Sequence, residues 1–162
     1  MRNTCTLGRR GILAGLGALA LALSMSGHLR AETLPLVTVT KDPSCGCCNG
    51  WVEHIEAAGF PVRVLESADM FGLKQRRGVP AELASCHTAD VGGYVIEGHV
   101  PAAAVKRLLT GRPAGVGLAV PGMPAGSPGM DFPGVEPEPY EVFLFDASGH
   151  NAFLRFLGVQ EI

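Results

Sequence analysis

Apolar and polar side chains follow one another in a pattern that predicts strands and helices in alternation. Residues 35–40 are rich in β-branched side chains and predict a strand, which the turn-forming residues 42–44 end. From Cys48 to Gly59, apolar residues recur at three- and four-residue spacing, which is typical of a helix with one buried face. Residues 61–65 predict a second strand. Strand, helix and strand in this order predict a βαβ unit with parallel strands.

The remaining periodic segments extend this α/β pattern. Ser67 is a good N-cap for a short helix over 68–76, and Pro101 opens a helix that runs to Leu109. Two apolar runs around a Ser-, Gly- and Asn-containing turn predict a closing β-hairpin. The fold class expected is α/β, with a mixed central sheet flanked by helices. The further strands predicted are 94–96, 141–145 and 152–156.

A long segment between the last helix and the hairpin has a different composition. Residues 111–139 contain 7 glycines and 7 prolines in 29 positions, a composition that predicts neither regular helix nor strand. Loops of this length in compact domains tend to be functional or disordered. The segment is apolar and carries little charge, so we expect a loop laid across the protein. Met123 and Met130 each occupy a Pro-Gly-Met turn within it.

The N-terminal segment has the features of an export signal. Arg9-Arg10 precedes an uncharged apolar run over 12–23, which is shorter than the roughly 20 residues that a transmembrane helix needs. The expected organisation is a signal over 1–31, cut after Ala31 or near Ser26, and a single domain over 32–162. Both the twin-arginine and the ordinary secretory route fit, and no stable membrane span is expected after cleavage.

Charge and cysteine content change once that segment is removed. Residues 32–162 carry 9 Lys and Arg against 15 Asp and Glu, a net charge of −6, whereas the whole chain has −2. An acidic protein without a basic stripe is not expected to bind nucleic acid. Cys5 leaves with the signal, and the four remaining cysteines would lie in a compartment where unprotected thiols oxidise.

Three of those four cysteines stand at the predicted start of the first helix, as Cys45-Gly46-Cys47-Cys48. A helix N-terminus favours anions, so thiols there become nucleophiles or metal ligands more readily. Cys45 and Cys48 have the C-x-x-C spacing of a redox dithiol, which predicts thiol–disulfide exchange. The third thiol, together with Cys86 and His87 further along, favours a soft metal instead.

Two other interpretations of the cysteines remain open. A disulfide that only staples an exported domain is one, although adjacent Cys47 and Cys48 are poorly placed to bond to each other. A structural zinc site is the other, although C-x-C-C packs three donors tightly for one tetrahedron. Thioethers alongside clustered thiols favour Cu(I), and four thiolates exceed what one Cu(I) needs, so more than one copper ion is expected.

Histidine provides further candidate ligands. His99 lies in a loop between the predicted strand 94–96 and the helix that follows, a common place for functional side chains. His54, on the first helix, and His150, in the hairpin turn, are expected to be structural or to face solvent.

Several segments together resemble the CopG-like family of periplasmic copper-resistance proteins, which bind metal. The similarity runs from about Leu34 to Phe156, with no departure at the motif positions. The segments that carry it are Lys41-Asp42-Pro43-Ser44-Cys45-Gly46-Cys47-Cys48 with Gly50-Trp51 and His54, Ser85-Cys86-His87-Thr88-Ala89, Tyr94-Val95-Ile96-Glu97-Gly98-His99-Val100-Pro101, Gly117-Leu118-Ala119-Val120-Pro121-Gly122-Met123-Pro124 and Gly126-Ser127-Pro128-Gly129-Met130.

This resemblance implies a thioredoxin-like fold and a cysteine-bridged multinuclear copper cluster in the periplasm. It further implies a role in copper resistance with Cu(I)/Cu(II) interconversion, which would make the protein a copper-dependent oxidoreductase. Periplasmic redox proteins and copper-efflux components are the partners that such a role suggests. The alternative is a thiol–disulfide oxidoreductase that uses Cys45 and Cys48. The ligands implied by the matching motifs are Cys45, Cys47, Cys48 and Cys86, with some of His87, His99, Met123 and Met130.

Overall fold

The described chain starts with the βαβ unit that the apolar pattern predicts. In the computed structural model, which describes residues 33–162, β1 (Val37–Lys41) is followed by α2 (Cys47–Ala57), and β2 (Val62–Glu66) runs parallel to β1. The export signal expected over residues 1–31 lies outside the described residues. No helix within residues 33–162 has the length and hydropathy to cross a membrane.

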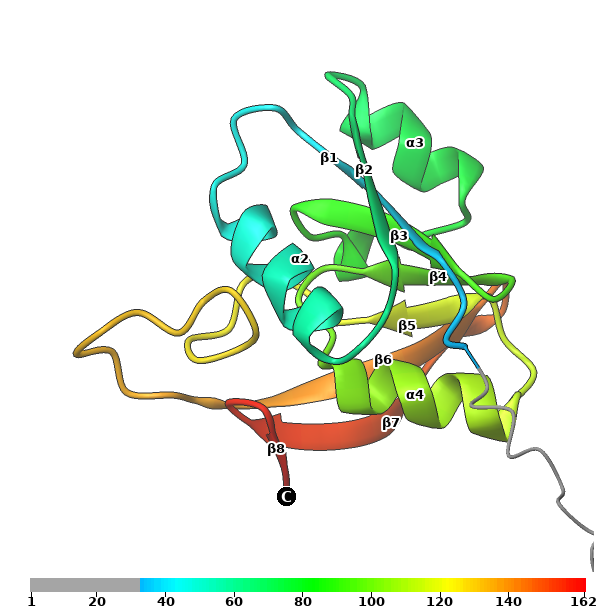
Figure 1. The fold of residues 1–162 in the computed structure, drawn as a ribbon. Coiled ribbons are helices and arrows are strands. Elements are labelled where there is room, and N and C mark those ends of the chain that lie inside the picture. Colours follow the sequence, from blue (N-terminus) through cyan, green and yellow to red (C-terminus); the bar gives the residue numbers. More distant parts are fainter. Residues whose placement is uncertain (1–32) are drawn as a thin grey trace, which may run out of the picture. The chain divides into compact units, whose positions relative to one another are not determined.

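All the strands of this part of the chain join one sheet (Figure 1). Its order is β2-β1-β3-β4-β5-β6-β7-β8, with β1/β2 and β4/β5 parallel and the other neighbours antiparallel. A mixed sheet with flanking helices confirms the predicted α/β class, while the finer thioredoxin-like assignment stays a prediction. The further strands are β3 (His87–Val91), β4 (Tyr94–Glu97), β5 (Gly117–Ala119), β6 (Pro139–Asp146), β7 (Gly149–Leu157) and β8 (Gln160–Glu161).

Two helices cover one face of the sheet. α2 and α4 (Ala102–Gly111) lie on the same side in Figure 1, and their buried residues join one hydrophobic cluster with Val39 of β1 and Ile96 of β4. Trp51 of α2 is fully buried there, and its indole N–H donates to the carbonyl of Val100 at 2.9 Å. This bond and the cluster hold the start of α2 close to the ends of the central strands.

The opposite face has a smaller apolar cluster. Val95 of β4 and Phe145 of β6 pack there with Leu83 of the short 3₁₀ helix η1 (Ala81–Leu83). α3 (Met70–Arg76) belongs to this face, because its buried Lys74 bonds side chains of β3 and β4 that point away from α2.

The structure corrects two of these predictions. Residues 111–139 do contain a strand, β5, which is short and pairs with β4 and β6. Gly117 is required in it, because a Cβ there would overlap the carbonyl of Val95. The N-cap of α3 is Asp69, whose carboxylate accepts the Gly72 N–H at 2.8 Å, while Ser67 accepts the Asp69 N–H instead.

Candidate metal centre

The turn between β1 and α2 carries the first cysteines. Asp42 forms it by accepting the backbone N–H of Ser44 at 2.8 Å and, through its carbonyl, that of Cys45 at 3.0 Å. Hydrogen bonds from Ser44 lower the pKa of the Asp42 carboxyl. Cys45 and the fully buried Cys48 are joined by a disulfide, with their Cα atoms 5.6 Å apart. The C-x-x-C pair is therefore present in its oxidised form at the start of α2.

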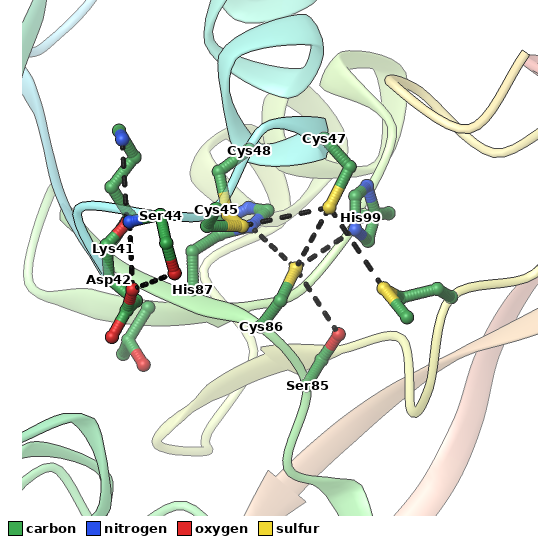
Figure 2. The surroundings of a disulfide bond; sticks show 12 residues. Lys41, Asp42, Ser44, Cys45, Cys47, Cys48, Ser85, Cys86, His87 and His99 are labelled. Atoms are coloured by element: carbon green, nitrogen blue, oxygen red, sulfur yellow. Dashed lines mark hydrogen bonds between the residues drawn. A yellow bond between two sulfur atoms is a disulfide. The ribbon is translucent and has the colours of Figure 1, made fainter.

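The other two cysteines of residues 33–162 are free thiols that lie against this disulfide. The Sγ atom of Cys47 is 3.6 Å from that of Cys45 and 3.9 Å from that of Cys86, which precedes β3 (Figure 2). All four sulfurs, including that of Cys48, lie within 4.8 Å of one another. The Sδ atom of Met123 lies 3.9 Å from the Cys47 sulfur, with its residue about half exposed.

A second group of donors shares one of these sulfurs. In Figure 2 the Cys86 sulfur contacts the Cys47 sulfur and two imidazoles, at 3.0 Å from Nε2 of His99 and 3.3 Å from Nδ1 of His87. The three ligand atoms also lie within 4.8 Å of one another. Four sulfurs and two imidazoles therefore form two groups that meet at Cys86.

The surroundings of the two histidines favour ligation. Nδ1 of His99 lies 2.8 Å from the carbonyl oxygen of Pro128, which can only accept, so Nδ1 carries the proton and Nε2 presents a lone pair toward Cys86. The ring of His87 lies 4.5 Å from that of Trp51. Its Nε2 is buried and has no hydrogen-bond partner among the described residues. Such an orphaned nitrogen is costly in a purely structural role.

Burial also sets the charge of these groups. The pKa of His87 lies well below its ordinary value because of burial, with smaller effects from His99 and Lys74. Burial lowers the pKa of His99 as well. Burial and the neighbouring Cys47 raise the pKa of Cys86 to about 12. Near neutral pH the imidazoles are thus neutral, as ligands must be, and Cys86 has to lose a proton when it binds metal.

The Gly- and Pro-rich loop between β5 and β6, residues 120–138, lies directly against the first turn of α2. Gly129 has a positive φ of 83°, and a Cβ there would lie 2.7 Å from both the Cys47 carbonyl oxygen and the Trp51 nitrogen. Gly50 faces Gly129 just as closely. Near the start of the loop, the Gly122 carbonyl accepts a hydrogen bond from the hydroxyl of Ser85 at 2.5 Å. These contacts bring Met123 and the Pro128 carbonyl to the cysteines.

The remaining residues considered have other contacts, and Met130 as a ligand stays a prediction. Met130 is half-buried, its backbone N–H donates to Ser127 at 2.7 Å, and none of the sulfur contacts found within residues 33–162 includes it. His54 accepts the Ala102 N–H through Nε2 at 3.0 Å, a structural role at the start of α4. Nδ1 of His150, in β7, lies 3.9 Å from a carboxylate oxygen of Glu82.

Sequence reasoning missed the parts of the site that are backbone. Neither the Pro128 carbonyl nor the contact between Gly50 and Gly129 has a side-chain signal. The only sequence features related to that contact are the two glycines themselves, Gly50 near the start of the predicted helix and Gly129 in a Pro-Gly-Met turn.

Comparison with known proteins places these residues in a family. A family model described as a protein of unknown function, DUF411, matches residues 83–130. A search of curated protein sequences gives no match. Two solved structures of "Copper resistance protein copG", Form 1 and Form 2, are each 42% identical to the chain, with TM-scores of 0.70 and 0.71. The matches cover 77% and 76% of this chain and 99% and 98% of theirs. The chain therefore belongs to the CopG family of copper resistance proteins.

Proposed function

We propose that this protein binds copper at the cysteine cluster and acts in copper resistance. The observation that carries the proposal is the convergence of four sulfurs within 4.8 Å, with Cys86 shared between them and two imidazoles. Thiolate and thioether sulfur together with neutral imidazole is a donor set that suits Cu(I). The copper-resistance function of the relatives at 42% identity supports the same metal.

We further propose that more than one copper ion binds per chain. One Cu(I) is satisfied by two or three soft donors, whereas this site holds four cysteines, His87 and His99, with Met123 at its exposed edge. Sulfurs about 4 Å apart are close enough to bridge two metal ions. A cluster of this kind can change between Cu(I) and Cu(II), so redox turnover of copper belongs to the proposal.

Copper loading of all four cysteines requires reduction of the Cys45–Cys48 disulfide. That step takes two electrons and two protons and yields two thiols, so the proposal includes a dithiol reductant as a partner. Metal binding then releases the thiol protons. Copper-efflux components, which would take the released metal, are the other partners proposed.

The location and the finer fold are part of this proposal. The Arg9-Arg10 segment and the apolar run after it support export to the periplasm, where copper defence and a disulfide are both expected. The βαβ unit with a C-x-x-C pair between its first strand and helix supports a thioredoxin-like assignment of the N-terminal half of the sheet.

The test is an anaerobic Cu(I) titration of the reduced protein, followed by competition with a Cu(I) chelator. We expect more than one equivalent of copper per chain and no cysteine left free to an alkylating reagent. Because Cys86 belongs to both donor groups, Cys86→Ser should lose copper at least as severely as Cys45→Ser. Saturation at one equivalent with two or more thiols free would contradict the cluster.

A thiol–disulfide oxidoreductase is the second candidate function. The observation that favours it is the Cys45–Cys48 disulfide at the start of α2, where a helix N-terminus stabilises a thiolate. An enzyme of this kind needs an attacking and a resolving thiol only. Insulin-disulfide reduction and copper tolerance of cells, each measured for Cys48→Ser and Cys86→Ser, separate the two. Full tolerance and full copper content with Cys86→Ser would favour the oxidoreductase.

A further inference from the structure

A buried ion pair lies next to the segment that carries Cys86 and leads into β3, on the face of the sheet opposite α2. Glu97 of β4 is completely buried, and one of its carboxylate oxygens accepts from Nζ of Lys74, in α3, at 2.6 Å. Lys74 is itself buried and also donates to the Thr88 hydroxyl at 3.0 Å. No sequence signal singled out either charged residue.

The same carboxylate bonds residues on both sides of two candidate ligands. Its first oxygen also accepts the backbone N–H of Ser85 at 2.6 Å, and its second accepts the hydroxyl of Thr88 at 2.7 Å. Ser85 and Thr88 are the residues that flank Cys86 and His87 in the chain. One carboxylate therefore fixes the chain on both sides of this pair.

The third candidate ligand is tied to the same point. His99 follows Glu97 by two residues, and the N–H of Gly98 between them donates to the carbonyl of His87 at 3.0 Å. The Cys86 sulfur and the His99 Nε2, 3.0 Å apart, thus come from two segments that are joined through Glu97.

We propose that Glu97 is a positioning residue that sets the geometry of Cys86, His87 and His99 as copper ligands. This inference rests on the proposed copper-binding function and deepens it. Outer-shell partners that orient metal ligands commonly change metal affinity by about 10- to 100-fold when they are removed.

Stability alone is a weak reason for a chain to hold such a pair. Replacing a buried ion pair by apolar residues of similar volume is often neutral or stabilising, because two charges no longer have to be desolvated. An apolar side chain at position 97 cannot accept the Ser85 N–H, however, so the segment that leads into Cys86 would have to move to satisfy that donor.

The experiment compares two double variants that share one replacement at position 74. Lys74→Met with Glu97→Gln, called the Gln pair of substitutions, removes both charges and keeps a carbonyl that can accept the Ser85 N–H. Lys74→Met with Glu97→Leu, called the Leu pair, removes both charges and that acceptor. Copper retained against a Cu(I) chelator should be within about threefold of wild type for the Gln pair and about 10- to 100-fold weaker for the Leu pair. X-ray absorption should show fewer nitrogen ligands at copper in the Leu pair only.

A surface ion pair between α3 and β3, the strand next to β4, provides the control. Arg77, at the end of α3, bonds Asp90 of β3 at 2.8 Å, with both side chains more than two fifths exposed. Arg77→Met with Asp90→Asn should leave copper binding unchanged. The metal-free, reduced protein gives a readout independent of copper: alkylation of Cys86, mapped by peptide mass, should be several-fold faster in the Leu pair than in the Gln pair.

The outcomes separate the two proposals. Wild-type protein that binds no copper would overturn the proposed function, and the alkylation rates would still test the positioning role. Copper binding and alkylation that are equal in the Gln and Leu pairs would overturn the inference alone. Equal losses in both pairs would overturn it too, because the acceptor for Ser85 would then not be the cause.

Discussion

Replacing Gly129 by alanine tests whether the Gly- and Pro-rich loop is fixed on α2 as the structure places it. The added Cβ would lie 2.7 Å from the Cys47 carbonyl oxygen and from the Trp51 nitrogen, both backbone atoms of α2. Neither atom can withdraw without moving the first turn of the helix. The residue also has a φ of 83°, which disfavours any side chain.

The magnitude follows from these two effects. A non-glycine residue in the left-handed region costs roughly 1–2 kcal/mol. Forcing a methyl group into a filled space costs about 1–3 kcal/mol more. Gly134→Ala is the matched control, because Gly134 lies in the same loop with a φ of 80° and an added Cβ would meet nothing within 4 Å. Gly134→Ala should therefore show only the first cost, of roughly 1–2 kcal/mol.

The assay has two parts, unfolding of the metal-free protein in urea and copper retention against a chelator. The free energy of unfolding should fall by about 1–3 kcal/mol more for Gly129→Ala than for Gly134→Ala. Copper retention should fall for Gly129→Ala only, because displacement of the loop removes the Pro128 carbonyl from Nδ1 of His99. Equal stabilities and equal copper retention for the two variants would refute the close contact between loop and helix.

Three further changes have defined outcomes. Met123→Leu keeps the apolar volume and removes a sulfur 3.9 Å from that of Cys47, so copper affinity should fall modestly while the melting temperature of the metal-free protein stays unchanged. His54 has a pKa lowered mainly by burial, against a smaller effect of Asp131, and its neutral Nε2 accepts a backbone N–H. The stability that it contributes is present above its ordinary pKa of about 6.5 and is lost as pH falls below it. His54→Gln should therefore reduce, without abolishing, the fall in urea-unfolding stability between about pH 7 and about pH 5, because the buried His87 and His99 remain. Trp51→Phe leaves a buried carbonyl unpaired and should lower the free energy of unfolding by about 1–3 kcal/mol in the same assay, and an unchanged value would contradict the bond from its indole N–H.

Local patterns were sufficient for the parts of the fold whose side chains alternate or repeat within one segment. The βαβ unit and the hairpin of β6 and β7 were predicted because their apolar residues have clear helical or strand periodicity. β3 and β5 were missed because neither has such a pattern: β3 carries histidine, threonine and aspartate, and β5 is three residues long in a segment rich in glycine and proline. Their neighbours in the sheet make them strands.

For the site, too, local sequence patterns grouped only those residues that are close together in the chain. The cysteine spacing identified Cys45, Cys47 and Cys48 as one group, because their separation in the chain is short. Their proximity to Cys86, 39 residues beyond Cys47, depends on the antiparallel pairing of β1 with β3, which places His87 opposite Lys41 at the end of β1. No local pattern contains that pairing. The C-x-x-C spacing did single out Cys45 and Cys48 as a pair, and the structure shows them bonded, but the spacing alone left open whether they form a disulfide or bind metal.

The disulfide and the copper cluster are alternative states of the same sulfur atoms. A sulfur bonded to another sulfur has no thiolate to offer, so Cys45 and Cys48 can ligate copper only after two electrons reduce their bond. Cys86 takes no part in that bond, yet it lies in contact with both the cysteine cluster and the two imidazoles. In the oxidised protein Cys86, His87 and His99 would therefore remain available as metal ligands, whereas Cys45 and Cys48 would not. Reduction should then increase the number of copper ions bound, and a chelator titration of the protein in both states would show two capacities. Equal capacity in the two states would mean that Cys45 and Cys48 do not serve as ligands.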